Sequence, residues 1–138
     1  MLSAGFWLHH AALTWRAEMD ARLRPLGLTP TQFMVLATAG WLEHVDGPPT
    51  QQQVAVGAGT DRQMTSRVIR VLQDQGLITR QANESNARSL RVSLTPQGRA
   101  LARDAIQLAQ ALDEQLFGTS AAGLRATFRG IAEFRTQR

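Results

Sequence analysis

The 138-residue sequence contains no cysteine and no lysine. The absence of cysteine excludes disulfides, thiol redox switches and metal sites with thiolate ligands. The absence of lysine excludes catalysis that depends on a lysine amine, and it excludes the lysine of a P-loop. All fifteen cationic side chains are therefore arginines, and the formal net charge is +4. The planar guanidinium group suits recognition of phosphate and guanine, although such a bias can also be compositional.

Long apolar runs are also missing, because no stretch approaches the roughly 18 apolar residues of a membrane-spanning helix. The N-terminal region has no basic leader and soon carries Arg16, Glu18 and Asp20, which is unlike a secretory signal. We therefore expect no membrane partner and, by default, a cytoplasmic location. The length fits a single domain with its own hydrophobic core.

Motifs of catalysis and metal binding are absent as well. The sequence has no Gly-x-Ser-x-Gly, His-Glu-x-x-His or P-loop pattern. His9 and His10 would point about 100° apart on a helix, and the pair His44 and Asp46 has no third ligand nearby. We therefore expect no enzymatic activity, no cofactor and no metal site.

Residues 60–77 show a strongly amphipathic helical pattern. At about 100° per residue, one arc is predicted to be buried and contains Met64, Val68, Val71, Leu72 and Gln75. The opposite arc is polar and contains Arg62, Gln63, Ser66, Arg67, Arg70 and Gln73. Arginine and glutamine can read guanine and adenine in a major groove, but the face of any single helix can also be simply solvated. The flanking residues decide between these interpretations.

The residues before this helix predict a helix-turn-helix. Residues 4–26 carry a sustained apolar stripe, and Thr29, Pro30 and Gln32 predict the start of a second helix that fades near residue 43. The same capping spacing at Thr50 predicts a short third helix, and Gly57 and Gly59 mark its end. Thr60 and Gln63 repeat the spacing once more at the start of the amphipathic helix. Two short helices joined by a glycine-containing turn place the second helix in the groove.

The residues after it predict a β-hairpin. Residues 77–81 read as one strand, residues 82–87 as a polar tip, and residues 89–94 as a second strand with Leu90, Val92 and Leu94 on one face. A hairpin directly after a recognition helix is a wing, and Arg88 and Arg91 are placed to contact phosphates. Six arginines and three acidic residues lie between residues 61 and 91, so most of the net charge is in this segment.

Two further helices follow, one with a leucine-rich stripe over residues 101–116 and one with an apolar side made of Leu124, Phe128, Ile131 and Phe134. Neither is predicted to pack on the winged core. The apolar surface of residues 4–26 is wider than one small core needs, so a second copy of the chain is the simplest partner. Within a single domain of residues 1–138, we predict a DNA-binding lobe at 28–95 and a helical dimerisation lobe at 1–27 and 96–138.

This order of elements resembles the MarR family of bacterial transcriptional regulators. Residues 75–80 (QGLITR), Arg88 and residues 92–98 (VSLTPQG) resemble the family's recognition-helix exit, wing and dimer-helix start, and residues 26–33 (LGLTPTQF) are similar to its second-helix entry. The resemblance spans essentially the whole chain. It implies a mainly α fold with a small β-hairpin wing, and a homodimer that binds double-stranded DNA at a pseudo-palindromic operator. It also implies release by a small aromatic or phenolic effector.

By this resemblance, Ser66, Arg67 and Arg88 match family positions that contact DNA. Two positions depart from the family pattern: Asn86 replaces an aspartate that steadies the wing arginine, and Gln73 replaces an acidic residue. The predicted DNA-binding residues are Arg62, Gln63, Ser66, Arg67, Arg70, Arg88 and Arg91.

Six residues are candidates for an effector pocket between the lobes, although core and dimer packing is the default explanation for all of them: Trp7, His10, Trp15, Met19, Met34 and Trp41. The leading hypothesis is a dimeric, sequence-specific DNA-binding transcriptional regulator, and we expect it to be a repressor. The alternative is a winged-helix module that makes protein contacts, or that binds DNA nonspecifically, without a ligand response.

Overall fold

The computed structural model describes residues 2–83 and 86–137, with side chains at 83–89 and 137 left out of the description. The described elements are helices α1 (Ala4–Leu23), η1 (Arg24–Leu26), α2 (Pro30–Asp46), α3 (Gln51–Ala58) and α4 (Arg62–Asp74), strands β1 (Ile78–Asn83) and β2 (Asn86–Leu94), and helices α5 (Pro96–Phe117), η2 (Gly118–Ser120), α6 (Ala121–Ala132) and η3 (Phe134–Gln137). The predicted class, mainly α with a small β-hairpin wing, is confirmed.

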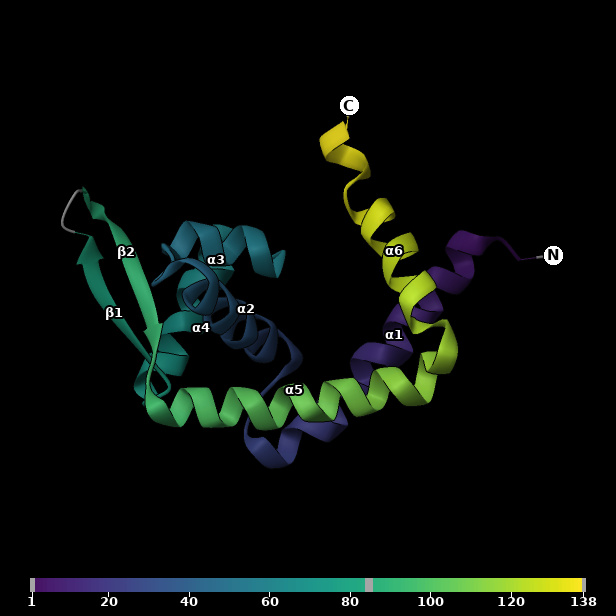
Figure 1. Ribbon diagram of the computed structural model, residues 1–138, viewed down its shortest axis with the longest axis horizontal. Coiled ribbons are helices and arrows are strands. Elements are labelled where there is room, and N and C mark those ends of the chain that lie inside the picture. Colours follow the sequence, from purple (N-terminus) through teal and green to yellow (C-terminus); the bar gives the residue numbers. More distant parts are fainter. Residues whose placement is uncertain (1, 84–85, 138) are drawn as a thin grey trace.

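Helix α5 runs along the length of the molecule and connects its two ends (Figure 1). Helices α2, α3 and α4 gather at the end where α5 begins, and the hairpin projects from them. Helices α1 and α6 lie towards the other end, together with both chain termini. Among the described residues, no helix is long and apolar enough to cross a membrane.

The helix starts at α2 and α3 follow directly from the sequence. The Thr29 Oγ1 accepts from the Gln32 amide at 3.1 Å, and the Gln32 side chain accepts from the Thr29 amide at 3.0 Å. Thr50 and Gln53 make the same reciprocal pair. Both capping boxes are therefore confirmed, and they satisfy amides that a helix start leaves without partners.

The predicted capping box at Thr60 is wrong. Helix α4 begins at Arg62, and its N-cap is Asp61, whose Oδ1 accepts from the Met64 amide at 2.7 Å. The Thr60 hydroxyl instead lies 2.6 Å from the Thr65 hydroxyl. Aspartate caps a helix at least as well as threonine. Because Asp61 is the cap, the Thr60 hydroxyl is free to pair with Thr65 in the first turn of α4.

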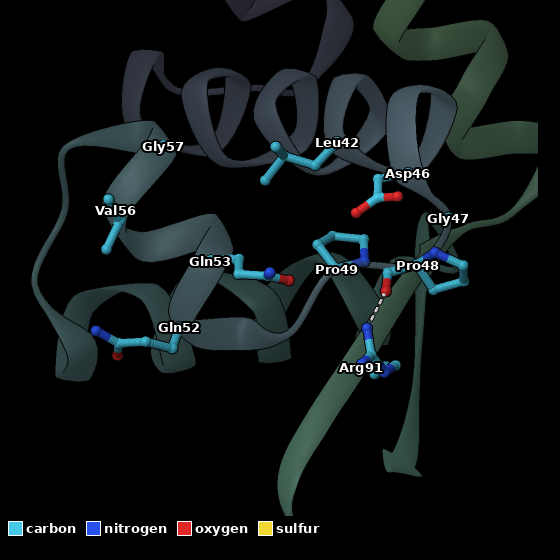
Figure 2. Close-up of a pocket in the computed structure, with 10 residues that line it drawn as sticks. All are labelled: Leu42, Asp46, Gly47, Pro48, Pro49, Gln52, Gln53, Val56, Gly57 and Arg91. Carbon is cyan, nitrogen blue, oxygen red and sulfur yellow. Dashed lines mark hydrogen bonds between the residues drawn. The ribbon is translucent and has the colours of Figure 1, made fainter. Parts of the chain in front are cut away.

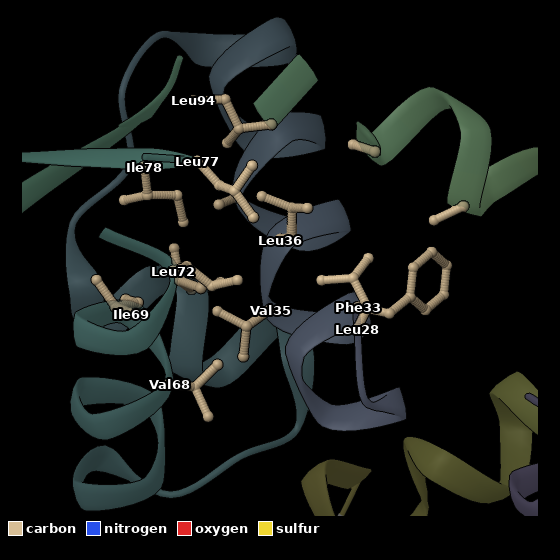
Figure 3. Close-up of a cluster of buried hydrophobic side chains, with 14 of the residues drawn as sticks. Leu28, Phe33, Val35, Leu36, Val68, Ile69, Leu72, Leu77, Ile78 and Leu94 are labelled. Atoms are coloured by element: carbon tan, nitrogen blue, oxygen red, sulfur yellow. The ribbon is translucent and has the colours of Figure 1, made fainter. Parts of the chain in front are cut away.

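One hydrophobic core joins α1, α2, α3, α4, the hairpin and α5, and Figure 3 shows part of it. Its fully buried side chains include Met19, Leu36, Ile69, Leu72 and Leu112. Ala102 and Ala105 of α5 belong to the same cluster. The expectation that neither C-terminal helix packs on the winged core is therefore wrong for α5, because alanines let this helix approach α2 closely.

The hairpin is antiparallel, with Ile78 opposite Leu94 and Arg80 opposite Val92. The loop between α2 and α3 contacts its outer edge, because the Val92 amide donates to the Pro49 carbonyl at 2.9 Å. Glu43, near the end of α2, accepts from the Leu94 amide at 3.3 Å and from Arg99 of α5 at 3.1 Å. The base of the wing is thus hydrogen-bonded to α2 and to the α2–α3 loop, and Glu43 also links α2 to α5.

Helices α1 and α6 expose much of their apolar surface. The N-terminal half of α1 buries no side chain, and Trp7, Leu8 and Leu13 are 59%, 48% and 51% exposed. In α6, Ile131 is 54% exposed and no residue is buried. The last helix is shorter than predicted, since Phe134 begins the separate turn η3, and Ser120 makes no side-chain cap bond.

Candidate nucleic-acid interface

The predicted polar face of α4 points away from the core. Arg62, Gln63, Arg67 and Arg70 are exposed and Ser66 is half-buried. Arg67 and Arg70 make no hydrogen bond or ion pair with any residue that the structure describes. These two guanidinium groups are therefore available to an external partner.

The buried face of α4 is rotated relative to the prediction. Val68 and Leu72 are buried as expected, but Gln75 is exposed just after the helix and Val71 is 37% exposed. Ile69 and Thr65 are buried in their place, at 0% and 1% exposure. The cause is that α2, α3 and β1 all pack on this helix and centre its covered arc near Leu72.

The apolar pattern of residues 60–77 does not predict the burial of Thr65, because threonine is polar. Its hydroxyl is satisfied inside the fold, since it donates to the Asp61 carbonyl at 2.7 Å and lies against the Thr60 hydroxyl. A buried hydroxyl with such partners carries little desolvation cost. Thr65 is therefore a buried residue of the first turn of α4, hydrogen-bonded to the connection between α3 and α4.

The two wing arginines differ in what the structure describes. Arg88 belongs to β2, but its side chain lies outside the described residues, as does that of Asn86. Arg91 is half-buried, and its Nη1 donates to the Pro48 carbonyl at 2.7 Å. Arg91 therefore anchors the wing to the α2–α3 loop, in addition to any contact that its remaining N–H groups make.

Arg91 also lines an open cavity of about 560 Å³ between the end of α2, the α2–α3 loop, α3 and β2 (Figure 2). Leu42, Pro49 and Val56 supply its apolar walls, and Asp46 and Gln52 supply polar groups. None of the six residues predicted for an effector pocket lines this cavity.

Those six residues are spread over two helices. Trp7 and His10 lie together on α1, with ring centroids 6.3 Å apart, and Trp15 is half-buried against the core. Met19 is completely buried in the core. On α2, Met34 and Trp41 are 36% and 65% exposed. The effector site itself stays a prediction.

Arg80 lies beside the polar face of α4, where it contacts Gln73, but it is not among the predicted site residues. Its Nε donates to Gln73 Oε1 at 2.9 Å and its Nη1 donates to Gln51 Oε1 at 3.4 Å. On α4 itself, Arg62 Nε lies 3.4 Å from Gln52 Oε1. The strand alternation contains the missing signal, because Arg80 is two residues from buried Ile78 and thus faces the helices.

The described residues form no cluster of acidic and histidine side chains that resembles a metal site. Within the described parts of the chain, no group of three or more His, Asp or Glu residues could hold a metal ion. The chemical character of this face comes instead from arginines, glutamines and a serine on α4, with arginines of the hairpin beside them.

Comparison with known proteins supports an interface for DNA. A model of the MarR family matches residues 26–89, which include α2, α3, α4 and most of the hairpin. An HTH-type transcriptional repressor of Mycobacterium tuberculosis is 33% identical over 129 residues, covering 94% of this chain and 90% of the relative. The family model and this relative together fix the family.

Solved structures agree with this match. The M. tuberculosis regulator MosR, in complex with DNA, has a TM-score of 0.78 and 25% identity, and covers 99% of this chain and 98% of that chain. The repressor CouR, bound to a 23-mer DNA duplex, has a TM-score of 0.80 and 27% identity, and covers 94% and 92%. CouR from Rhodococcus jostii is also known bound to p-coumaroyl-CoA. The chain is thus a winged-helix, DNA-binding transcriptional regulator, and it belongs to the MarR family.

Proposed function

We propose that this chain is a homodimeric repressor that binds a pseudo-palindromic operator, with α4 in the major groove and the wing along the flanking backbone. The observation that carries the proposal is the exposed face of α4, where Arg67 and Arg70 have no described partner. Unpaired arginines beside Gln63 provide both phosphate contacts and base-edge donors. The repressor role is supported by the name of the mycobacterial relative.

The homodimer is supported by the apolar surfaces of α1 and α6. Trp7 and Leu13 on α1 and Ile131 on α6 are each at least half exposed in the single chain. Large apolar side chains clustered at one end of a molecule are typical of an interface. A two-fold dimer through residues 1–27 and 96–138 would present two copies of α4 to successive major grooves, about 34 Å apart.

Substitution Arg67→Ala is expected to weaken operator binding about 5- to 150-fold and to relax the base preference at one operator position, because an arginine–guanine pair contributes about 1–3 kcal/mol. The operator is first selected from a random duplex library with the wild-type protein, and affinities are then measured by fluorescence anisotropy. Arg103→Ala removes an exposed arginine of α5 that also lacks a described partner, and serves as the matched control.

Equal affinity of the wild-type chain for the selected operator and for random competitor, at one salt concentration, would favour the nonspecific alternative. Wild-type affinity of Arg67→Ala for the operator would remove this face of α4 from the base-reading surface.

We infer further that a small aromatic ligand releases the operator. The complex of CouR with p-coumaroyl-CoA supports a ligand of this chemistry, and Trp41 and Met34 offer exposed apolar side chains on one face of α2. Titration with p-coumaric acid or its CoA thioester is expected to quench tryptophan fluorescence, less so in Trp41→Phe, and to weaken DNA binding in parallel. Quenching without loss of DNA binding would show that no regulatory coupling exists.

A further inference from the structure

We propose that Arg80 is a further DNA-contacting residue, which binds a backbone phosphate and is oriented by Gln51 and Gln73 without loss of its charge. This inference rests on the proposed function, because it requires that DNA lie across α4 and the wing.

Arg80 lies where three elements of the DNA-binding end meet. It belongs to β1, its Nε is bonded to Gln73 at 2.9 Å, and its Nη1 is bonded to Gln51 at 3.4 Å. Gln73 is exposed on α4, three residues after Arg70, and Gln51 is the first residue of α3. The two amide oxygens thus fix the direction of the guanidinium group between the first and second helices of the helix-turn-helix.

The arginines of the proposed DNA interface differ from most other arginines of the chain in the kind of group that they contact. Among the described side chains, arginine–carboxylate pairs occur on α1, η1, α5 and α6: Arg22 with Glu18, Arg24 with Asp20, Arg99 with Glu43, and Arg129 with Glu133. On the interface, the partners of Arg62, Arg80 and Arg91 among the described residues are amide or backbone oxygens. Arg16, bonded to the Thr31 hydroxyl, is an arginine outside the interface that also has a neutral partner.

A neutral acceptor and a carboxylate have different consequences for a DNA-binding arginine. Both hold the side chain in one direction, but a carboxylate also cancels the charge that attracts phosphate and competes for the same N–H groups. Two N–H groups of Arg80 are used by glutamines, and the others make no hydrogen bond with a residue that the structure describes. The side chain is therefore pre-oriented and still cationic.

The position of Arg80 agrees with how a helix-turn-helix meets DNA. The first helix of the motif crosses the phosphate backbone while the second enters the groove. Gln51 places the Nη1 end of Arg80 beside the N-terminal turn of that first helix, α3. A phosphate that approaches this turn is thus within the region that Arg80 can reach.

The test measures how affinity depends on salt for the wild-type chain, Arg80→Gln, Gln73→Glu and the double variant. The probe is a fluorescein-labelled random-sequence duplex of about 30 base pairs, because phosphate contacts are independent of sequence. Arg80→Gln is expected to weaken binding about five- to tenfold at 0.1 M salt and to reduce the slope of log K against log salt by about 0.9. Gln73→Glu keeps Arg80 but places a carboxylate against it, and should therefore also lower the affinity and reduce the salt slope.

The double variant separates neutralisation from simple repulsion by the new carboxylate. If the carboxylate acts through Arg80, it has no arginine to neutralise in the double variant. The loss of affinity in the double variant should then be at least threefold smaller than the product of the losses in the two single variants, a coupling that repulsion alone does not produce. Independent, fully multiplicative effects would overturn the proposed pairing. Arg103→Gln, on α5, is the matched charge control and should keep the wild-type slope.

A wild-type slope in Arg80→Gln would overturn the assignment, provided that thermal unfolding shows the variant to be folded. If that variant does not fold, Gln73→Glu decides, since it retains Arg80 and its packing, and an unchanged slope would then overturn the assignment. Failure of the wild-type chain to bind any duplex would instead overturn the proposed function, and Arg80 with it.

Discussion

Substitution Gly98→Ala is expected to destabilise the protein by about 3 kcal/mol, the upper part of the range for overpacking. A Cβ atom at residue 98 would lie 2.0 Å from the Leu77 carbonyl oxygen and 2.9 Å from its carbonyl carbon. Both are backbone atoms, so no side-chain rotation relieves the clash. The first turn of α5 would have to move away from the connection between α4 and β1.

That turn is also fixed by hydrogen bonds. The Thr95 hydroxyl donates to the Gly76 carbonyl at 2.7 Å and accepts from the Gly98 amide at 3.0 Å, while the Thr95 amide donates to the Leu77 carbonyl at 3.0 Å. A shift that accommodates the new methyl group would lengthen all three bonds. The steric and hydrogen-bond losses therefore add, which places the expected effect high in the range.

Urea unfolding at one fixed protein concentration measures the effect, because association with a second copy would otherwise shift the midpoint. Gly123→Ala is the matched control: it lies in α6, where a Cβ meets nothing within 4 Å. There the exchange should stabilise by about 0.5–1 kcal/mol through helix propensity. Equal unfolding midpoints for the two variants would contradict the close approach at Gly98.

Substitution Ile131→Glu is expected to convert the proposed dimer to monomers at micromolar concentration and to weaken operator binding at least about 100-fold. Ile131 is 54% exposed on α6, so a carboxylate there is solvated in the single chain and leaves its fold intact. In a dimer the same carboxylate would be buried without a partner, which is strongly unfavourable. Loss of the second subunit removes the effective concentration that links two half-site contacts.

Sedimentation equilibrium gives the mass, and fluorescence anisotropy with the selected operator gives the affinity. Ala126→Glu adds the same charge to the same helix, at an exposed position about 140° from Ile131, and should leave both quantities near wild type. A dimeric Ile131→Glu with wild-type affinity would exclude α6 from the subunit interface.

Sequence patterns predicted the elements of this fold well where the signal was local. Reciprocal Thr–Gln pairs marked the starts of α2 and α3, and alternation marked the second strand, because these signals depend on residues only a few positions apart. The start of α4 was misplaced because Thr60 and Asp61 are adjacent and both can cap a helix. In the structure Asp61 accepts from the Met64 amide, while Thr60 is hydrogen-bonded to Thr65, five positions later.

Prediction of the site was limited by contacts between residues distant in sequence. The exposed face of α4 followed from periodicity, and the structure agrees on Arg62, Gln63, Arg67 and Arg70. The bond from Arg91 to the Pro48 carbonyl joins residues 43 positions apart, and no local pattern contains it. For Arg80, the strand alternation indicates the side that the residue faces, but its contact with Gln51, 29 positions earlier, is not contained in any local pattern.

Glu43 connects the wing mechanically to the long helix. Its carboxylate, 15% exposed, accepts from the last amide of β2 and from Arg99 in the first turns of α5. Any rotation of α5 about α2 must therefore break the ion pair or pull the exit of the wing along with it. Thermodynamic linkage makes this relation reciprocal. DNA that holds the wing in place would also restrain the orientation of α5, and through it the distance between the two halves of the proposed dimer.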